Sequence, residues 1–175
     1  MLILVTGGAG SGKSEFAEGL ITASGIAERR YLATMRLWDE ECRRRVERHR
    51  RARAGKGFLT VECPLDLSEA AEQIPAGAAV LLEDLTNLAS NQWFGGAGPE
   101  ETERTILAGM ERVREKAGLT VVVANELFSD GLDYDRETAE FLAAQAALNR
   151  LLCARADQVY EVVCGMPVCW KGRER

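Results

Sequence analysis

Short segments rich in apolar residues alternate along this chain with longer segments that have the pattern of helices. The apolar segments predict strands over residues 2–6, 30–34, 58–62, 78–83, 119–124 and 158–163. The segments between them predict helices over residues 13–23, 39–53, 67–73, 84–94, 100–116 and 137–155. Residues 80–82 and 121–123 are apolar at every position, which is typical of strands covered on both faces. The alternation predicts an α/β fold with a mainly parallel sheet and helices on both faces.

Length, charge and cysteine usage narrow the class of protein. The 175 residues contain no linker and no internal repeat, so we expect a single domain over residues 1–175. A net charge of -5 argues against general nucleic-acid binding, and no apolar run is long enough for a transmembrane helix. The chain also opens without the basic segment of a signal peptide. The five scattered cysteines indicate free thiols in a reducing cytoplasm, with a metal or disulfide at Cys164 and Cys169 as the alternative.

A phosphate-binding loop follows the first predicted strand at once and opens the first predicted helix. Its glycines allow backbone N–H groups to converge on phosphates, and the helix N-terminus adds partial positive charge. We expect Lys13 to reach the β- and γ-phosphates of ATP or GTP, and the Ser14 hydroxyl to bind Mg²⁺. The alternative is a glycine-rich turn that happens to contain a lysine. The predicted nucleotide-binding loop consists of Gly7, Gly8, Ala9, Gly10, Ser11, Gly12, Lys13 and Ser14.

The acid that completes such a site is expected at the end of a buried strand. The strand predicted at 78–83 ends in Glu83, and Asp84 follows it. Either carboxylate could hold Mg²⁺ directly or through water, and we favour Glu83. Asp84 could instead cap the next helix, which is compatible with a metal role for Glu83.

The helix predicted over residues 39–53 is rich in arginine and carries the only histidine of the chain. Its acidic start, basic end and Glu/Arg pairs four residues apart suit a solvated helix. Cys42, Val46 and His49, however, share the one face that can pack inward. Surrounding cations favour a neutral imidazole and attract a polyphosphate, so His49 is a candidate nucleophile toward phosphorus. On spacing alone, a packed structural histidine is the more common case.

Several short segments form an ordered set along the chain: LVTGGAGSGKS at 4–14, YLAT at 31–34, RVERHR at 45–50, TVECP with DL at 60–67, LLEDLT at 81–86 and NE at 125–126. In these segments, in order and over nearly its whole length, the chain resembles the bifunctional adenosylcobinamide kinase/adenosylcobinamide-phosphate guanylyltransferase family of cobalamin biosynthesis. The phosphate loop alone is generic, whereas its combination with the spaced histidine helix is much more specific.

The resemblance implies two reactions and several site residues. The first reaction moves a γ-phosphate from ATP or GTP to adenosylcobinamide, and the second transfers GMP from GTP through a covalent adduct on His49. The family pattern adds Thr34 and Glu62 to the nucleotide-binding residues. It also implies a RecA-like sheet, a corrinoid acceptor and a homo-oligomer, commonly a trimer.

The chain also departs from the family pattern. Gly10 stands where arginine is frequent, and residues 127–134 replace a glycine- and proline-containing segment. These changes fall on the corrinoid-facing loop more than on the nucleotide machinery, so one activity could be lost or the acceptor altered. Three other functions stay open: a single-activity kinase, a non-catalytic nucleotide-binding partner protein, and an RNA-binding protein that would contact RNA through the arginine-rich helix.

Overall fold

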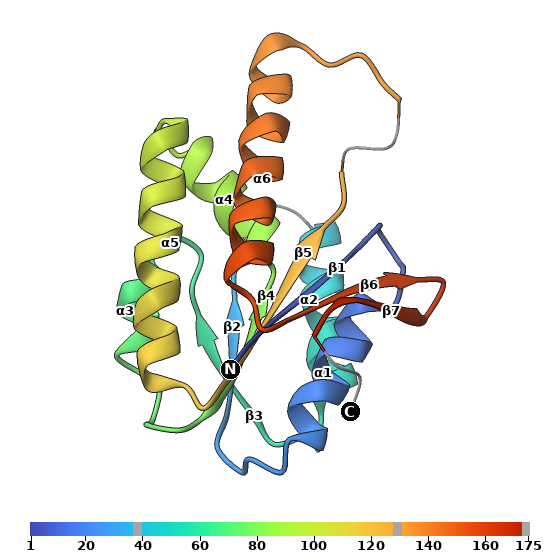
Figure 1. Ribbon diagram of the computed structural model, residues 1–175, viewed down its shortest axis with the longest axis vertical. Coiled ribbons are helices and arrows are strands. Elements are labelled where there is room, and N and C mark those ends of the chain that lie inside the picture. The colour runs from blue at the N-terminus through green and yellow to red at the C-terminus, as the bar shows by residue number, and fades with distance from the viewer. Residues whose placement is uncertain (37–39, 128–130, 173–175) are drawn as a thin grey trace.

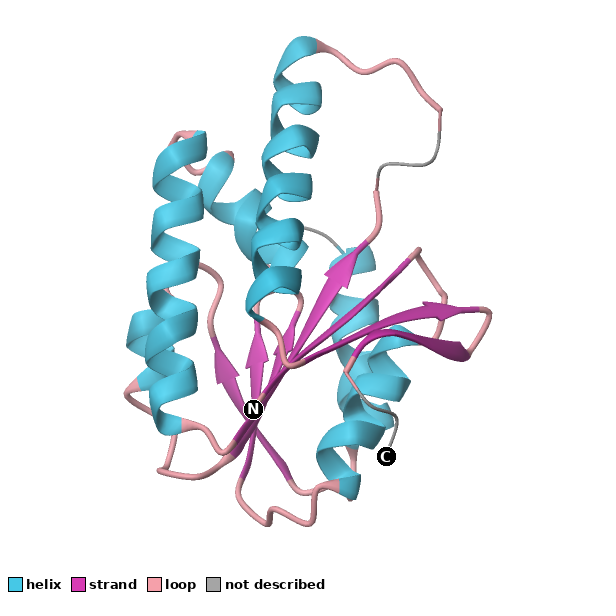
Figure 2. Ribbon diagram, viewed as in Figure 1, coloured by secondary structure: helices cyan, strands magenta, loops and turns pink. Residues whose placement is uncertain are grey.

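A twisted, mainly parallel sheet forms the centre of the computed structural model, which describes residues 1–36, 40–127 and 131–172 (Figures 1 and 2). The described strands lie in the order β3-β2-β4-β5-β1-β6-β7. All neighbours pair in parallel except β6 and β7, which are antiparallel. The strands are β1 (Leu2–Gly7), β2 (Arg29–Ala33), β3 (Phe58–Glu62), β4 (Ala79–Glu83), β5 (Leu119–Asn125), β6 (Gln158–Val163) and β7 (Met166–Lys171).

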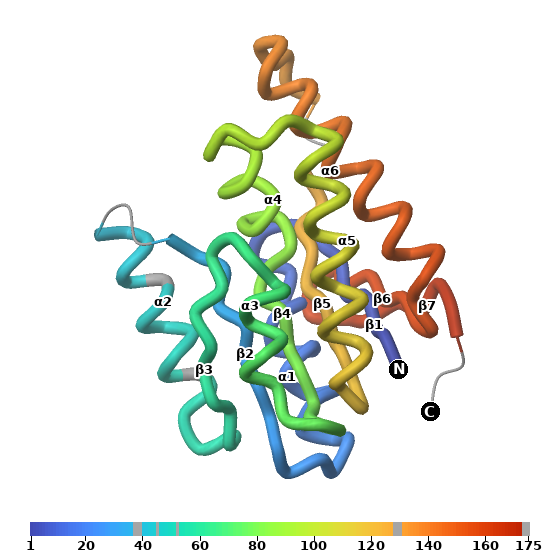
Figure 3. The backbone as a smooth tube through the Cα atoms, turned by 90° about the vertical axis from the view of Figure 1, so that its left-hand side faces the viewer, coloured from blue at the N-terminus to red at the C-terminus, as the bar shows by residue number. Residues whose placement is uncertain are grey.

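Helices cover both faces of this sheet (Figure 3). On one face, Leu2 and Leu4 of β1 pack in a cluster with residues of α3, α4, α5 and α6. On the other face, Ile3 and Val5 pack with α1. The helix α2 lies on this same face, where its Arg53 stacks on the ring of Tyr31. The helices are α1 (Lys13–Ala23), α2 (Glu40–Arg53), α3 (Leu67–Ala71), α4 (Leu85–Trp93), α5 (Pro99–Lys116) and α6 (Arg136–Arg155).

The side chains of β1 point alternately to the two faces of the sheet, and all of those from Leu2 to Val5 are apolar, which explains why the protein has a hydrophobic core on each face. Successive side chains of a strand point to opposite faces, so an entirely apolar strand needs cover on both sides. In β1, the residues from Leu2 to Val5 are at most 2% exposed, and β4 is buried throughout. The predicted α/β class with a mainly parallel sheet is therefore confirmed.

Several details differ from the sequence-based expectations. The strand β7 was not predicted, and α3 is shorter than the expected 67–73. The helix α2 begins at Glu40, and the expected first residue, Asp39, lies outside the described residues. All five cysteines are free thiols, so Cys164 and Cys169 are not joined by a disulfide. None of the described helices is both long and apolar enough to cross a membrane.

Candidate active site

The phosphate loop joins β1 to α1 at the carboxyl edge of the sheet, where open α/β sheets bind ligands. Its shape depends on glycine at two positions. A Cβ on Gly7 would lie 2.6 Å from the Val162 carbonyl oxygen, and Gly12 has a φ of 93°. Lys13 is 6% exposed, and its Nζ donates a hydrogen bond to the Gly8 carbonyl at 2.9 Å. The lysine is thus folded over the loop whose carbonyl it contacts.

The next residue of the loop connects it to β4. The Ser14 hydroxyl donates to Glu83 Oε1 at 2.7 Å, although β5 lies between β1 and β4 in the sheet. Glu83 Oε2 is buried and has no hydrogen-bond partner among the described residues. Burial raises the pKa of Glu83 from 4.5 to about 7; Asp84 raises it further, whereas Ser14 and Lys13 oppose the rise. The effect of burial on this carboxyl group therefore outweighs the opposing effects of Ser14 and Lys13.

Thr34 and Asp84 build the backbone around Glu83. The Thr34 hydroxyl accepts from the Asp84 N–H at 2.8 Å and lies 3.0 Å from the Glu83 carbonyl oxygen. Asp84 caps α4 by accepting from the Asn87 N–H at 2.6 Å. Its other oxygen accepts from the side chains of Asn87 and Asn125. The structure places Thr34 behind the site, and the capping role considered for Asp84 is observed.

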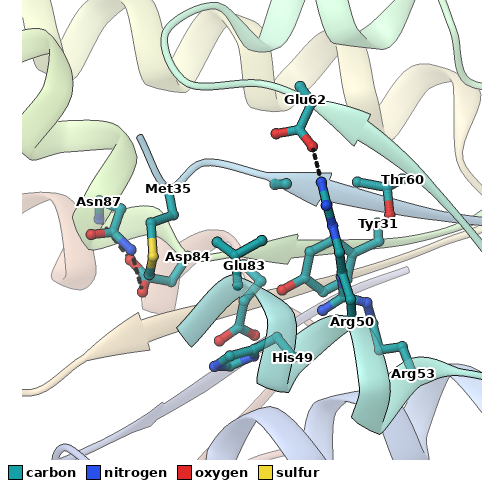
Figure 4. Close-up of a pocket in the computed structure, with 12 residues that line it drawn as sticks. Tyr31, Met35, His49, Arg50, Arg53, Thr60, Glu62, Glu83, Asp84 and Asn87 are labelled. Carbon is teal, nitrogen blue, oxygen red and sulfur yellow. Dashed lines mark hydrogen bonds and ion pairs between the residues drawn. The ribbon is translucent and has the colours of Figure 1, made fainter. Parts of the chain in front are cut away.

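The helix α2 forms one wall of a pocket that faces Glu83 (Figure 4). His49 lines this pocket together with Val46, which lies three residues before it on α2. Val46 and Cys42 are partly buried, so the predicted inward face of the helix is observed. The pocket is lined by Tyr31, Ala33, Met35, Val46, His49, Arg50, Arg53, Thr60, Glu62, Glu83, Asp84 and Asn87.

Two arginines of α2 give the pocket a positive wall. The guanidinium carbon of Arg53 lies 3.3 Å from the centroid of the Tyr31 ring, and Arg53 is only 7% exposed. Its Nη1 has no hydrogen-bond partner in the described part of the chain. Arg50, in contrast, is exposed and pairs with Glu62 at the rim, at 3.3 Å. A buried guanidinium with spare donor capacity is suited to an anionic ligand.

Glu83 joins the two halves of the candidate site. It contacts Ser14 of the phosphate loop and lines the pocket that holds His49. Of the other predicted binding residues, Glu62 lies at the rim and Thr34 lies behind Glu83. Sequence reasoning missed Arg53 as a lining residue. Its position four residues after His49, on the same helix face, was the available signal.

The residues present fit a magnesium ion that arrives with a nucleotide. Mg²⁺ prefers hard oxygen ligands, usually one or two from the protein together with phosphates and water. Ser14 Oγ and the unsatisfied Glu83 carboxylate supply such oxygens at the phosphate loop. Within the described ranges, no group of three or more His, Cys, Asp or Glu side chains could hold a metal by itself.

Comparison with known proteins identifies the family. The model for "Cobinamide kinase / cobinamide phosphate guanyltransferase" matches residues 3–170. The chain belongs to this family. Two curated relatives are named bifunctional adenosylcobalamin biosynthesis protein CobU, one from Salmonella typhimurium and one from Escherichia coli. Each is 33% identical to this chain, covering 96% of it and 98% of the relative.

A third family member extends the comparison, and a solved structure supports the fold. The relative from Pseudomonas aeruginosa, named CobP, is 31% identical over 97% of this chain and 96% of its own. The flagellar accessory protein FlaH from Methanocaldococcus jannaschii superposes with a TM-score of 0.52 at 10% identity, covering 98% of this chain and 78% of FlaH. This last likeness shows the fold alone and agrees with the predicted α/β fold with a mainly parallel sheet.

Proposed function

We propose that this protein phosphorylates adenosylcobinamide with ATP or GTP and then transfers GMP from GTP to adenosylcobinamide phosphate. Membership of the family supports the pair of reactions. The observation that carries the proposal for this chain is the position of Glu83, which contacts the phosphate loop and lines the pocket of His49. One nucleotide-binding region can thereby present a γ-phosphate to an acceptor hydroxyl and an α-phosphate to an imidazole.

In the kinase reaction, the chain's contribution is positioning and charge neutralisation. The loop N–H groups bind the phosphates, and Lys13 exchanges its contact with the Gly8 carbonyl for the β- and γ-phosphates. Ser14 and Glu83 would hold Mg²⁺, which neutralises phosphate charge when it is bound. The acceptor hydroxyl of adenosylcobinamide attacks the γ-phosphorus in line and releases its proton to solvent, the bond between the γ-phosphorus and the bridging oxygen breaks, and ADP or GDP leaves.

In the guanylyl reaction, a nitrogen of His49 acts as the nucleophile. The imidazole attacks the α-phosphorus of GTP, a phosphorus–nitrogen bond forms, and pyrophosphate leaves. An oxygen of adenosylcobinamide phosphate then attacks the same phosphorus, which gives adenosyl-GDP-cobinamide and frees the imidazole. Arg53 is placed to bind a phosphoryl oxygen during these steps, because it lines the same pocket one helical turn from His49.

An experiment with labelled GTP distinguishes this function from the alternative functions. The protein is incubated with α-labelled or γ-labelled GTP, with and without adenosylcobinamide. We expect γ-label in the corrinoid, and α-label first on the protein and then in the corrinoid. A single-activity kinase would transfer only the γ-label, and a non-catalytic nucleotide-binding protein would transfer neither.

We also propose that the protein is a cytoplasmic homo-oligomer, commonly a trimer in this family. Five free thiols suit a reducing compartment. An apolar stripe on the edge strand β7, formed by Met166, Val168 and Trp170, supports self-association because such patches mark interfaces. Light scattering of the purified protein tests the assembly: a mass of one chain would exclude it.

A further inference from the structure

A second, largely apolar pocket lies on the α4–α6 face of the sheet, away from the His49 pocket. It has a volume of about 570 Å³ and is open on one side. The end of α4, the residues after β5 and the first turns of α6 meet there, at one end of the molecule (Figures 1 and 3). Its walls include Phe94, Leu127, Tyr134, Phe141 and Leu142, and Glu126 is the only charged residue among its described lining residues.

Backbone contacts tie this pocket to the phosphate loop. The Glu126 N–H donates to the carbonyl oxygen of Gly7, the first glycine of the loop, at 3.0 Å. Asn125 pairs with Gly7 in the sheet, and its side chain donates to Asp84 at 3.3 Å. The phosphate loop therefore has the His49 pocket on one face of the sheet and the apolar pocket on the other.

Two aromatic side chains at this pocket are exposed to solvent. Phe94 is 56% exposed and Tyr134 is 41% exposed, yet both lie beside a concave surface. Phe94 also packs against Phe141, with ring centroids 5.4 Å apart. Exposed aromatic residues around a hollow of this size are typical of a site for an organic ligand.

We propose that this pocket binds the corrin ring of the acceptor and thereby directs the hydroxyl of its side arm toward the phosphate loop. This inference rests on the proposed function. Adenosylcobinamide combines a broad, largely apolar ring with one net positive charge and a flexible arm that ends in a hydroxyl. Aromatic walls suit the ring and Glu126 suits its charge. The open side of the pocket leaves room for a ring larger than the pocket itself.

The proposal divides the two substrates between the faces of the sheet. The nucleotide occupies the loop and the His49 pocket, whereas the acceptor occupies the apolar pocket and reaches the loop along β5. Changes in the apolar pocket should therefore weaken corrinoid binding without weakening nucleotide binding. This separation is what an experiment can detect.

The test measures binding of adenosylcobinamide to nucleotide-free protein by calorimetry, for the wild type, Phe94→Ser and Tyr134→Ser. Leu59→Ser is the matched control, since Leu59 is 60% exposed, lies on β3 and lines neither pocket. We expect each pocket variant to raise the Kd for adenosylcobinamide by about tenfold or more, because each substitution removes one aromatic contact with the corrin ring. The control should keep the wild-type Kd. All variants should retain the wild-type Kd for GTP and the same covalent labelling by α-labelled GTP.

An unchanged corrinoid Kd in both pocket variants would overturn the inference while leaving the proposed function intact. An equal loss of GTP binding would also overturn it, because the effect would then not be specific to the acceptor. A wild-type protein that neither binds nor phosphorylates adenosylcobinamide would instead refute the proposed function, and this inference with it.

Discussion

Glu83 should make the nucleotide-free protein less stable as the pH rises. Its pKa is raised from 4.5 to about 7, chiefly by burial, so the folded state holds the proton more tightly than the unfolded state does. The stabilisation is fully present below about pH 4.5 and is lost as the pH rises through about 7. At 1.36 kcal/mol per pKa unit, the total loss is on the order of 3 kcal/mol.

Glu83→Gln is the variant that isolates this effect. Glutamine has the shape of the protonated acid and can still accept the hydrogen bond from Ser14. We expect similar free energies of unfolding for wild type and variant near pH 4. Near pH 9 the variant should be more stable by about 3 kcal/mol, because only the wild type carries a buried charge.

Urea unfolding at a series of pH values, in the presence of a chelator and without nucleotide, measures the free energy of unfolding of the wild type and of the variant. Adding Mg²⁺ and ATP near pH 8 should then stabilise the wild type more than the variant, because the ionised carboxylate helps to hold the cation. Parallel stability profiles for the two proteins between pH 4 and pH 9 would refute the raised pKa of Glu83. Equal stabilisation by Mg²⁺ and ATP would refute its role toward the metal.

Three further substitutions test other parts of the site. Lys13→Ala should lower the rate of γ-phosphate transfer by about 10²–10³-fold at an unchanged melting temperature, and near-normal turnover would contradict the assignment of the loop. Arg53→Met keeps the length of the side chain and removes its charge, so labelling by α-labelled GTP should slow by about 10²-fold while γ-phosphate transfer is retained; equal losses of both would indicate a structural role. Asn91→Ala removes hydrogen bonds to the Thr34 and Pro64 carbonyls, at 2.8 and 2.9 Å, and should cost about 1–3 kcal/mol in urea unfolding; an unchanged midpoint would show that water replaces them.

The sequence predicted the centre of the parallel sheet well because β1, β4 and β5 are buried on both faces and read as nearly continuous apolar runs. The strand β7 escaped prediction because it lies at the edge, contains Pro167, and leaves Met166, Val168 and Trp170 exposed. Proline is tolerated at an edge, where its missing N–H breaks no ladder. In β7 the proline and the exposed apolar residues therefore concealed the strand, whereas the other edge strand, β3, was predicted.

The candidate site was predictable where residues are adjacent in sequence and less so where the fold brings them together. The phosphate loop and the inward face of His49 follow from local spacing. The contact between Ser14 and Glu83 crosses the intervening strand β5, and the stacking of Arg53 on Tyr31 joins α2 to β2. The apolar pocket beside Glu126 depends on α4 and α6 meeting, which no local pattern specifies.

The covalent GMP adduct on His49 tests the central claim most directly. The protein is incubated with α-labelled GTP, and the labelled residue is located by mass spectrometry of peptides. A phosphoramidate is stable to alkali and labile in mild acid, unlike a phosphate ester of serine or threonine. We expect one GMP on His49 with these properties, and His49→Asn should lose the label yet still transfer γ-phosphate to adenosylcobinamide. Covalent α-label on the Asn variant, or label on another residue of the wild type, would contradict the account.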